Sequence, residues 1–503
     1  MILITLYAFN IFQSSSCRTI LSPKPTYRLP LLGVNAIIVT MTTWQPDLSS
    51  HSGPRYVAIA NALADDISAG AFTAGDRLPT HRDLAWRLGV TVGTVSRAYA
   101  EAERRGLVSG EVGRGTYVRN IAPMVTQAMA APATDDSFID MTLNFPPAGS
   151  EAAAIGPTLQ AMAADPATAG LLRYHPNAGL AEHRVAGADW LARCGVEVNA
   201  ERVVVTAGAQ HGVTVVLASL TRPGDRILTE GVTYPGLQLA ARLLGLHLDP
   251  LPLDQHGVRP DALEAACRRG TYRALYCIPT LQNPTTVTMP VERREAIVDI
   301  AHRHALPILE DDIFRRLAPA PPPPLCTLAP DLVYYITGLS KTAAPGLRVG
   351  FVAAPAIAID RLASAIRTTC WIAPPIAVEI ACRWIRDGAA ERILDDLRRE
   401  SAWRRNRVLK ALDRWDVDCA PGALHAWLHL PEPWRSTDFT AEAKRRGLGI
   451  TPAEAFSVGR RAPAHAIRAC FGPLPSRAAL DKALTILTEM LEDRPLQAFG
   501  SIV

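Results

Sequence analysis

The chain has 503 residues, of which 48% are hydrophobic and 20% are charged. Because a single domain has roughly 150 residues, we expect at least two folded units, and the apolar content excludes a disordered chain. The net charge of +4 is too small for a chain that is basic throughout, so any surface that binds nucleic acid must be local.

Nine cysteines are scattered along the chain without a C-x-x-C pair, which is typical of reduced, intracellular protein and not of a disulfide framework or a zinc site. No apolar run reaches the roughly 20 residues that span a membrane.

Residues 1–50 are interpreted as an extension that is disordered or precedes the native start. Residues 1–12 are apolar, but no basic region precedes them and no cleavage site follows, so we favour a start at Met41 over a signal peptide. We expect a cytoplasmic protein without a metal site or a membrane span.

Residues 51–120 are predicted to form an α+β winged helix-turn-helix. Apolar residues recur at helical spacing over residues 56–67 and predict a first helix. Thr80, with Asp83 three residues later, matches a capping box, so a second helix should begin there and run to Leu88.

A third helix is predicted over residues 92–105, with Thr91 as its cap, and a short turn with a glycine separates it from the second. Two short apolar runs then flank a glycine-rich turn at Arg114, which is typical of a β-hairpin wing. In such a fold the third helix meets the major groove, and the start of the second helix and the wing tip meet the DNA backbone or the minor groove. The side chains expected to bind DNA are Arg82, Thr91, Thr94, Arg97 and Arg114.

Two strings of residues make this pattern specific: L-P-T-x-R-x-L-A at 78–85 and T-V-S-R-A-Y at 94–99. Together with the wing they closely resemble the winged helix-turn-helix of the GntR family of bacterial regulators. The resemblance implies that double-stranded operator DNA is a partner. Residues 121–137 follow with two prolines and several alanines but no amphipathic period, and they are interpreted as a linker.

In residues 138–497, predicted strands alternate with helices, which predicts an α/β fold with a mostly parallel sheet. Ligands of such folds sit beyond the carboxyl ends of the strands. A proline tract at 319–324 is interpreted as a stiff surface loop in preference to a partner-docking segment. The predicted strands cover residues 202–206, 226–229, 274–278, 307–309, 332–336 and 349–352.

The turns after these strands carry chemically useful groups. The first turn, residues 206–212, is rich in small residues and opens a helix, where free backbone N–H groups favour a phosphate. The later turns add an aromatic ring, an amide, a carboxylate, an amine and a guanidinium at the same edge of the sheet: Tyr234, Asn283, Asp311, Lys341 and Arg348.

This set matches the needs of pyridoxal phosphate. The cofactor takes an amine for a Schiff base, a carboxylate for its pyridine nitrogen, donors for its phosphate and a ring that stacks on it. Of the lysines in the chain, only Lys341 lies at a strand end. Burial and the nearby Arg348 are expected to lower the pKa of its amine, which favours imine formation. A solvated loop lysine is the alternative, and the order of the surrounding groups argues against it.

This unit resembles the fold-type I aminotransferases, which have a small C-terminal α+β subdomain, here from about residue 385 to 497. Its fusion to a GntR-like domain resembles the MocR subfamily of pyridoxal-phosphate-dependent regulators. The resemblance implies that Lys341 carries the cofactor as an aldimine and that Asp311 pairs with the pyridine nitrogen. It also implies that Asn283 binds the phenolic oxygen and that Tyr234 stacks on the ring.

Further roles follow from the same resemblance. Arg468 matches the arginine that grips the α-carboxylate of an amino acid. Tyr174 falls where the family often reaches the phosphate of the neighbouring subunit, which implies a homodimer. The implied phosphate ligands within one chain are Gly208, Ala209, Gln210, Ser340 and Arg348.

Three residues depart from the family's pattern. Phe314 stands where a tyrosine commonly donates to the phenolic oxygen, Gly338 replaces a hydroxyl residue three positions before the lysine, and Thr286 replaces a turn glycine. None of these changes removes cofactor binding, but together they weaken the case for fast catalysis.

Two functions of different classes fit these residues. The first is a transcriptional regulator whose winged domain binds operator DNA and whose aminotransferase-like domain senses pyridoxal phosphate, an amino acid or amine, or both. The second is an active aminotransferase that acts on an amino acid, with the winged domain secondary. The fusion favours the first, because an enzyme has no evident need of a DNA-reading domain.

Overall fold

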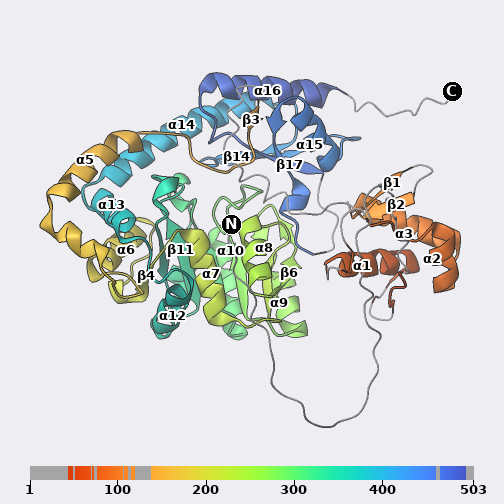
Figure 1. Ribbon diagram of the computed structural model, residues 1–503, viewed down its shortest axis with the longest axis horizontal. Helices are drawn as coiled ribbons and strands as arrows, with labels where there is room; N and C mark the ends of the chain where they lie inside the picture. The colour runs from red at the N-terminus through yellow and green to blue at the C-terminus, as the bar shows by residue number, and fades with distance from the viewer. Residues whose placement is uncertain are drawn as a thin grey trace, which may run out of the picture.

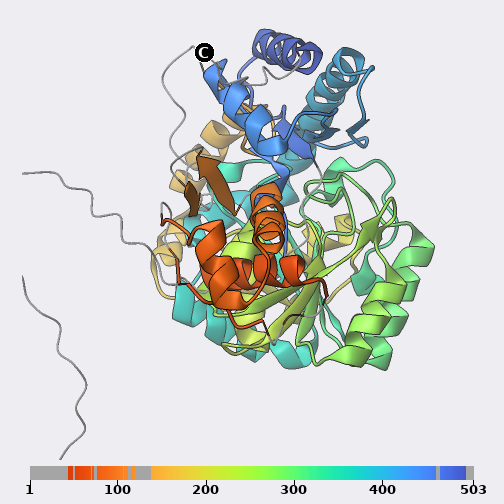
Figure 2. The same ribbon diagram turned by 90° about the vertical axis from the view of Figure 1, so that its right-hand side faces the viewer.

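The computed structural model of the chain describes residues 44–48, 51, 53–68, 71–72, 76–105, 107–111, 115–118, 138–459 and 465–493. They form a winged unit and a larger body, in which a small subdomain lies above a central sheet (Figures 1 and 2). The fold class predicted from the sequence is confirmed. Arg114, one of the predicted DNA ligands, lies outside the described residues. In the part of the chain that is described, no helix is long and apolar enough to cross a bilayer.

The winged unit consists of α1 (Arg55–Ser68), α2 (His81–Leu88), α3 (Val92–Arg104) and the antiparallel hairpin of β1 (Val108–Glu111) and β2 (Gly115–Val118). Both predicted caps form. Thr80 Oγ1 accepts a hydrogen bond from the N–H of Asp83 at 3.2 Å, and Thr91 Oγ1 accepts one from the N–H of Thr94 at 3.2 Å. Gly89, with a φ of 62°, ends α2 in the left-handed conformation.

The core of the winged unit reaches further toward the N-terminus than residue 51. Trp44 is 8% exposed, packs edge-on against Phe72 and donates its Nε1–H to Asp66 Oδ2 at 2.7 Å. It belongs to the apolar cluster that α1 and α3 form. The sequence did not indicate this contact, because a tryptophan in a segment without periodicity gives no signal of burial.

A seven-stranded sheet lies at the centre of the body, in the order β4-β12-β11-β10-β9-β5-β6. Its strands pair in parallel except β12, which is antiparallel to both neighbours. The predicted strands lie close to the observed ones, and β6 was missed because only Leu251 of it is buried. The strands are β4 (Val203–Thr206), β5 (Arg226–Glu230), β6 (His247–Leu251), β9 (Ala274–Cys277), β10 (Ile308–Asp311), β11 (Val333–Gly338) and β12 (Gly350–Ala353).

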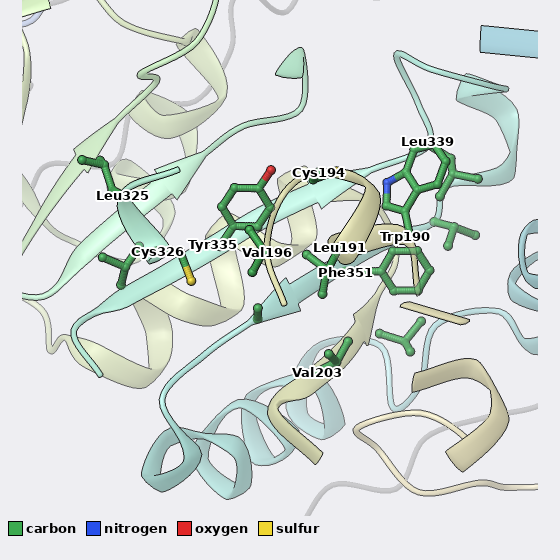
Figure 3. Packing of buried hydrophobic residues seen from close by; sticks show 14 of the residues in the cluster. Trp190, Leu191, Cys194, Val196, Val203, Leu325, Cys326, Tyr335, Leu339 and Phe351 are labelled. Carbon is green, nitrogen blue, oxygen red and sulfur yellow. The ribbon is translucent and has the colours of Figure 1, made fainter. Parts of the chain in front are cut away.

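Helices cover both faces of this sheet. One face packs against α6 (Ala181–Arg193), α9 (Pro260–Arg269), α10 (Val291–Arg303) and α13 (Pro375–Arg386). Trp190 and Phe351 lie in this core (Figure 3), and a Cβ on Gly187 would lie 2.6 Å from the Phe351 ring. The other face packs against α7 (Ala209–Leu220), α8 (Pro235–Leu243) and α12 (Ile359–Thr369). Because strand side chains alternate between faces, Tyr335 enters the first core and Tyr276 the second.

The small subdomain is an antiparallel sheet in the order β13-β14-β17-β16, packed against α14 (Ala389–Ala411), α15 (Ser436–Arg445) and α16 (Arg477–Glu492). Its strands are β13 (Val417–Asp418), β14 (His425–His429), β16 (Thr451–Pro452) and β17 (Ala466–Cys470). β3 (Ile139–Asp140) pairs in parallel with β15 (Leu448–Gly449). The chain that comes from the winged unit therefore joins the small subdomain first. The remaining elements are α5 (Glu151–Ala164), β7 (Leu253–Asp254), β8 (Gly257–Val258) and α11 (Leu325–Leu328).

Candidate cofactor site and DNA-binding face

The turn between β4 and α7 forms a cradle that depends on glycine. Gly208 has a φ of 88° and precedes α7, whose first backbone N–H groups have no intrahelical acceptor. A Cβ on Gly208 would lie 2.7 Å from Nη2 of Arg348, and a Cβ on Gly350 would lie 2.9 Å from the nitrogen of Ala209. The glycines therefore let the helix start approach the guanidinium, and this combination suits a phosphate group.

The turn after β11 brings Ser340 and Arg348 to the same cradle. Arg348 has a φ of 53°, and its Nη1 donates to Ser340 Oγ at 3.2 Å. The structure also explains one departure from the family's pattern. A Cβ on Gly338 would lie 2.8 Å from the carbonyl oxygen of Val349, so a hydroxyl side chain has no room at this position.

The amine of Lys341 lies inside the site. Its Nζ donates to the backbone oxygen of Asn144 at 2.5 Å and lies 4.9 Å from the centre of the Phe145 ring. Burial lowers the pKa of this amine from 10.5 to about 8, and Arg468 and Arg348 act in the same direction. A neutral amine is the reactive form in imine formation, so the environment favours the reaction near neutral pH.

Asp311 lies at the end of β10 and is 2% exposed. Its Oδ2 accepts a hydrogen bond from the Tyr276 hydroxyl at 2.7 Å, whereas its Oδ1 has no partner among the described residues. Burial raises the pKa of the carboxyl group to about 6, while the Tyr276 hydrogen bond lowers it. A buried carboxylate oxygen without a partner is suited to accept a hydrogen bond from a ligand.

Asn283 and Arg468 are held together by a hydrogen bond. Arg468, on β17, donates from Nη1 to Asn283 Oδ1 at 2.9 Å and from Nη2 to the backbone oxygen of Thr142 at 2.6 Å. Its guanidinium lies 4.6 Å from the centre of the Phe456 ring, and its Nε finds no acceptor in the described part of the chain. Since Oδ1 of Asn283 is engaged, the amide nitrogen of this residue is the group left to donate to a ligand.

Tyr234 follows β5, and Gln210 lies in the first turn of α7. Burial raises the pKa of Tyr234 to about 12, and the negative charge of Asp311 adds to the rise. Gln210 Nε2 donates to the backbone oxygen of Gly236 at 2.9 Å, and its buried Oε1 has no described partner. Gln210 thus supports the turn next to Tyr234, and its contribution to a phosphate would come from its backbone.

Tyr174 is not brought to this edge within one chain. Its side chain is 84% exposed and its ring lies 5.6 Å from that of Trp371. Asn177 donates to the backbone oxygen of Trp371 at 2.7 Å and ties the two segments together. An exposed aromatic pair of this kind fits the expectation that Tyr174 serves a neighbouring subunit, which remains a prediction.

The other departures have local explanations. Phe314 is 3% exposed and belongs to the apolar core of the small subdomain, so a phenol at this position would have to leave that core to reach the site. Thr286 has a φ of 61°, in the left-handed region that favours glycine, and its Oγ1 accepts a hydrogen bond from the N–H of Ala420 at 3.1 Å.

Three residues of the site were missed from the sequence: Tyr276, Asn144 and His425. His425, on β14, is 1% exposed, with its Nε2 3.0 Å from the backbone oxygen of Pro284 and its Nδ1 3.0 Å from Asn144 Nδ2. A carbonyl can only accept, so Nε2 carries the proton and Nδ1 accepts from Asn144. Burial lowers the pKa of His425 to about 3, with Arg468 adding to the effect, so the ring is neutral. No local pattern marks these residues, because their partners come from distant segments.

The predicted DNA ligands that are described lie at the N-terminal ends of α2 and α3. Thr91 and Thr94 are at the start of α3, with their Oγ1 atoms 2.9 Å apart. Arg97 is exposed, and its guanidinium lies 5.6 Å from the centre of the Tyr56 ring. Arg82 is exposed in the first turn of α2. This arrangement presents hydroxyl and guanidinium groups at the end of α3 that enters the major groove in winged helix-turn-helix proteins.

The fold and these two sites define a class of protein in which an aminotransferase-type body is joined to a winged helix-turn-helix. Residues 137–487 match the family model described as aminotransferase class I and II, and residues 55–118 match the one described as bacterial regulatory proteins, gntR family. The chain belongs to the aminotransferase class I and II family and, with its gntR-type domain, to the MocR subfamily of regulators.

Particular relatives agree with this assignment. The HTH-type transcriptional regulator YdeF of Bacillus subtilis is 30% identical over 90% of this chain and 97% of its own length. The pyridoxine biosynthesis transcriptional regulator PdxR of Corynebacterium glutamicum is 29% identical over 76% of this chain and 85% of its own. Among solved structures, LysN, an α-aminoadipate aminotransferase of Thermus thermophilus complexed with N-(5'-phosphopyridoxyl)-L-leucine, has a TM-score of 0.64 at 24% identity, covering 73% of this chain and 96% of that one. The last comparison shows the fold alone.

The residues of the sheet edge fit pyridoxal phosphate. Asp311 Oδ1 is a buried acceptor without a described partner, and the lowered pKa of Lys341 suits an amine that attacks an aldehyde. The glycine cradle leaves the start of α7 open to an anion. When bound, pyridoxal phosphate supplies an electrophilic aldehyde and an electron-accepting ring.

Proposed function

We propose that this protein is a transcriptional regulator that binds operator DNA through its winged unit and pyridoxal phosphate through Lys341. The observation that carries the proposal is the presence, in one chain, of a winged helix-turn-helix and of a half-buried lysine near a buried carboxylate at the sheet edge. A regulator acts on the chromosome, so we also propose that the protein is cytoplasmic.

In this proposal each group of the sheet edge has one task. Lys341 forms the covalent bond to the cofactor aldehyde, and Asp311 Oδ1 accepts the pyridine N–H. Asn283 Nδ2 donates to the phenolic oxygen, and Tyr234 stacks on the ring. The phosphate is bound by the backbone of Gly208, Ala209 and Gln210 together with Ser340 and Arg348, and Tyr174 completes the site of the partner in a homodimer.

The winged unit reads the operator. Thr91, Thr94 and Arg97 of α3 contact base edges, while Arg82 and Arg114 contact the backbone or the minor groove. Since a homodimer carries two winged units, we propose that the operator contains two half-sites.

The signal is pyridoxal phosphate, an amino compound, or both. The relative named for pyridoxine biosynthesis supports pyridoxal phosphate as a signal. Arg468 supports an amino acid, because its guanidinium is buried, is held by Asn283 and has an Nε without a described acceptor. A carboxylate is the anion that such a planar donor set fits best.

Gel shift with DNA upstream of the protein's own gene tests the proposal. We expect the wild type to shift this DNA at moderate salt and its affinity to change when pyridoxal phosphate is added. Lys341→Ala should keep DNA binding and lose the response to the cofactor. Arg468→Ala should lose only a response to amino acids. Failure of the wild type to shift the fragment, with and without cofactor, would refute the regulatory function.

A working aminotransferase is the second candidate, and the arrangement of Lys341, Asn283 and Arg468 favours it. Incubation of the cofactor-loaded protein with each amino acid should then abolish the visible absorbance of the bound cofactor. Retention of this absorbance with every amino acid would exclude transamination and leave the regulatory function untouched.

A further inference from the structure

Tyr276 belongs to the candidate cofactor site but has no part in the roles assigned above. It is on β9, beside Leu309 of β10 in the register of the sheet, and its side chain points to the face that α7, α8 and α12 cover. The residue is fully buried, and its hydroxyl donates to Asp311 Oδ2 at 2.7 Å. Asp311 lies two residues beyond Leu309 on the same face, so the ring reaches forward along the sheet to meet the carboxylate.

Because of this contact, the two carboxylate oxygens of Asp311 have different roles. Oδ2 is occupied by Tyr276, whereas Oδ1 has no acceptor or donor partner in the described residues. A carboxylate in a nearly dry site needs a donor to remain ionised. The hydroxyl provides this donor on the side away from the ligand and thereby fixes the rotation of the carboxylate about its Cβ–Cγ bond.

We propose that Tyr276 is a positioning residue for the cofactor: its hydroxyl holds Asp311 ionised and turned so that Oδ1 faces the pyridine nitrogen. The inference rests on the proposed pyridoxal phosphate site. Tyr276 does not touch the cofactor itself in this arrangement, so its effect is carried by Asp311.

The chain offers a matched control. Tyr335 on β11 is also fully buried, and its hydroxyl lies 3.3 Å from Asp312 Oδ2. Its side chain enters the core on the opposite face of the sheet. Tyr276→Phe and Tyr335→Phe therefore each remove one buried hydroxyl from a neighbouring carboxylate, and only the first carboxylate faces the cofactor site.

Pyridoxal phosphate binding to the full-length protein, followed by absorbance and by quenching of tryptophan fluorescence, is the first readout. Asp311 must be charged to bind the cofactor, and the Tyr276 hydroxyl stabilises this charge. Loss of a hydrogen bond to a buried charged group weakens the binding that depends on the charge about tenfold or more. We expect Tyr276→Phe to raise the Kd for pyridoxal phosphate roughly tenfold and Tyr335→Phe to leave it within about twofold. Wild-type affinity in Tyr276→Phe, or equal losses in the two variants, would overturn the inference.

The pH profile of binding separates positioning from packing. Binding requires Asp311 to be ionised, so the affinity for pyridoxal phosphate should fall at acidic pH. Loss of the Tyr276 hydrogen bond raises the pKa of Asp311, so the pH at which affinity falls should rise by about one unit. The other charged or titratable groups near Asp311 are Asp312, Lys341, Glu230 and Tyr234. Both variants keep all of them, so an unchanged acid limb in Tyr276→Phe would contradict the proposal.

A second measurement tests whether the effect of Tyr276→Phe is carried by Asp311 or by a general loss of packing. In an Asp311→Asn background the carboxylate is absent, so Tyr276→Phe should cause no further loss of cofactor affinity. A further loss in that background would overturn the inference. If the wild type itself binds no pyridoxal phosphate, the proposed function fails, and that result is distinct from the failure of Tyr276→Phe to differ from the wild type.

Discussion

Arg294 of α10 allows a test of how much a buried ion pair stabilises the body of the protein. The side chain is completely buried and donates to the backbone oxygens of Met289 and Pro279 at 3.0 and 2.8 Å. Its Nη1 also lies 3.7 Å from Glu310 Oε1, which is equally buried. The perturbation is Arg294→Met, which keeps much of the volume but removes the charge and all the donors.

The expected cost follows from the burial of the pair. Removing one partner of a buried ion pair destabilises a protein by roughly 3–5 kcal/mol, because the other charge is left without compensation. Burial and the neighbouring Asp312 already raise the pKa of Glu310 to about 7, and Arg294 lowers it. Without the arginine this pKa rises further, so Glu310 takes up a proton more readily. The loss of stability should therefore be smaller at pH 6 than at pH 8.

Urea unfolding followed by tryptophan fluorescence measures this loss, since Trp190 and Trp384 lie in the same core. Arg268→Met is the control, because Arg268 forms an ion pair with Glu264 while its own side chain is 73% exposed. That change should cost less than about 1 kcal/mol. A cost for Arg294→Met below about 1 kcal/mol, or the opposite pH trend, would refute the reasoning.

Three further predictions concern the cofactor and the winged unit. Covalent capture of pyridoxal phosphate by Lys341, followed by stopped-flow absorbance, should accelerate about tenfold per pH unit below pH 8 and level off above it, because the amine has a pKa of about 8. Gly208→Ala should weaken pyridoxal phosphate binding about tenfold by displacing Arg348, whereas Gly346→Ala, whose Cβ would meet no described atom within 4 Å, should bind normally. Trp44→Ala should destabilise the winged unit by roughly 3–5 kcal/mol and abolish DNA binding, whereas Trp86→Ala, at an 84% exposed position, should leave the melting temperature within about a degree of the wild type.

Much of the site could be predicted because strand ends are visible in the sequence. Asn283, Asp311 and Lys341 each follow an apolar run, and parallel strands bring their carboxyl ends to one edge.

The interpretation of the proline tract as a stiff loop also agrees with its contacts. Pro322 and Pro323 accept hydrogen bonds from Arg315 and Arg294 at 2.7 and 3.2 Å, so the tract's carbonyl oxygens face the protein.

The remaining residues were hidden by their sequence context. Tyr276 lies inside an apolar strand, where a tyrosine looks like any other core residue. Asn144 and His425 are 281 residues apart in the chain, so only the packing of the small subdomain on the sheet shows that they meet. A single sequence reports local spacing well and distant pairing poorly, because the side chains that pair across the fold share no periodic pattern.

The entry of the chain into the body has a mechanical consequence. The segment arriving from the winged unit is anchored as β3, and its continuation reaches Asn144, whose carbonyl oxygen accepts a hydrogen bond from Lys341 Nζ. A covalent bond at Lys341 takes away the donor that this carbonyl now uses. If pyridoxal phosphate binds at Lys341 as proposed, the backbone next to the new bond belongs to the segment that leads back to the winged unit. That segment could then respond to the cofactor directly, without a relay through the interior of the body.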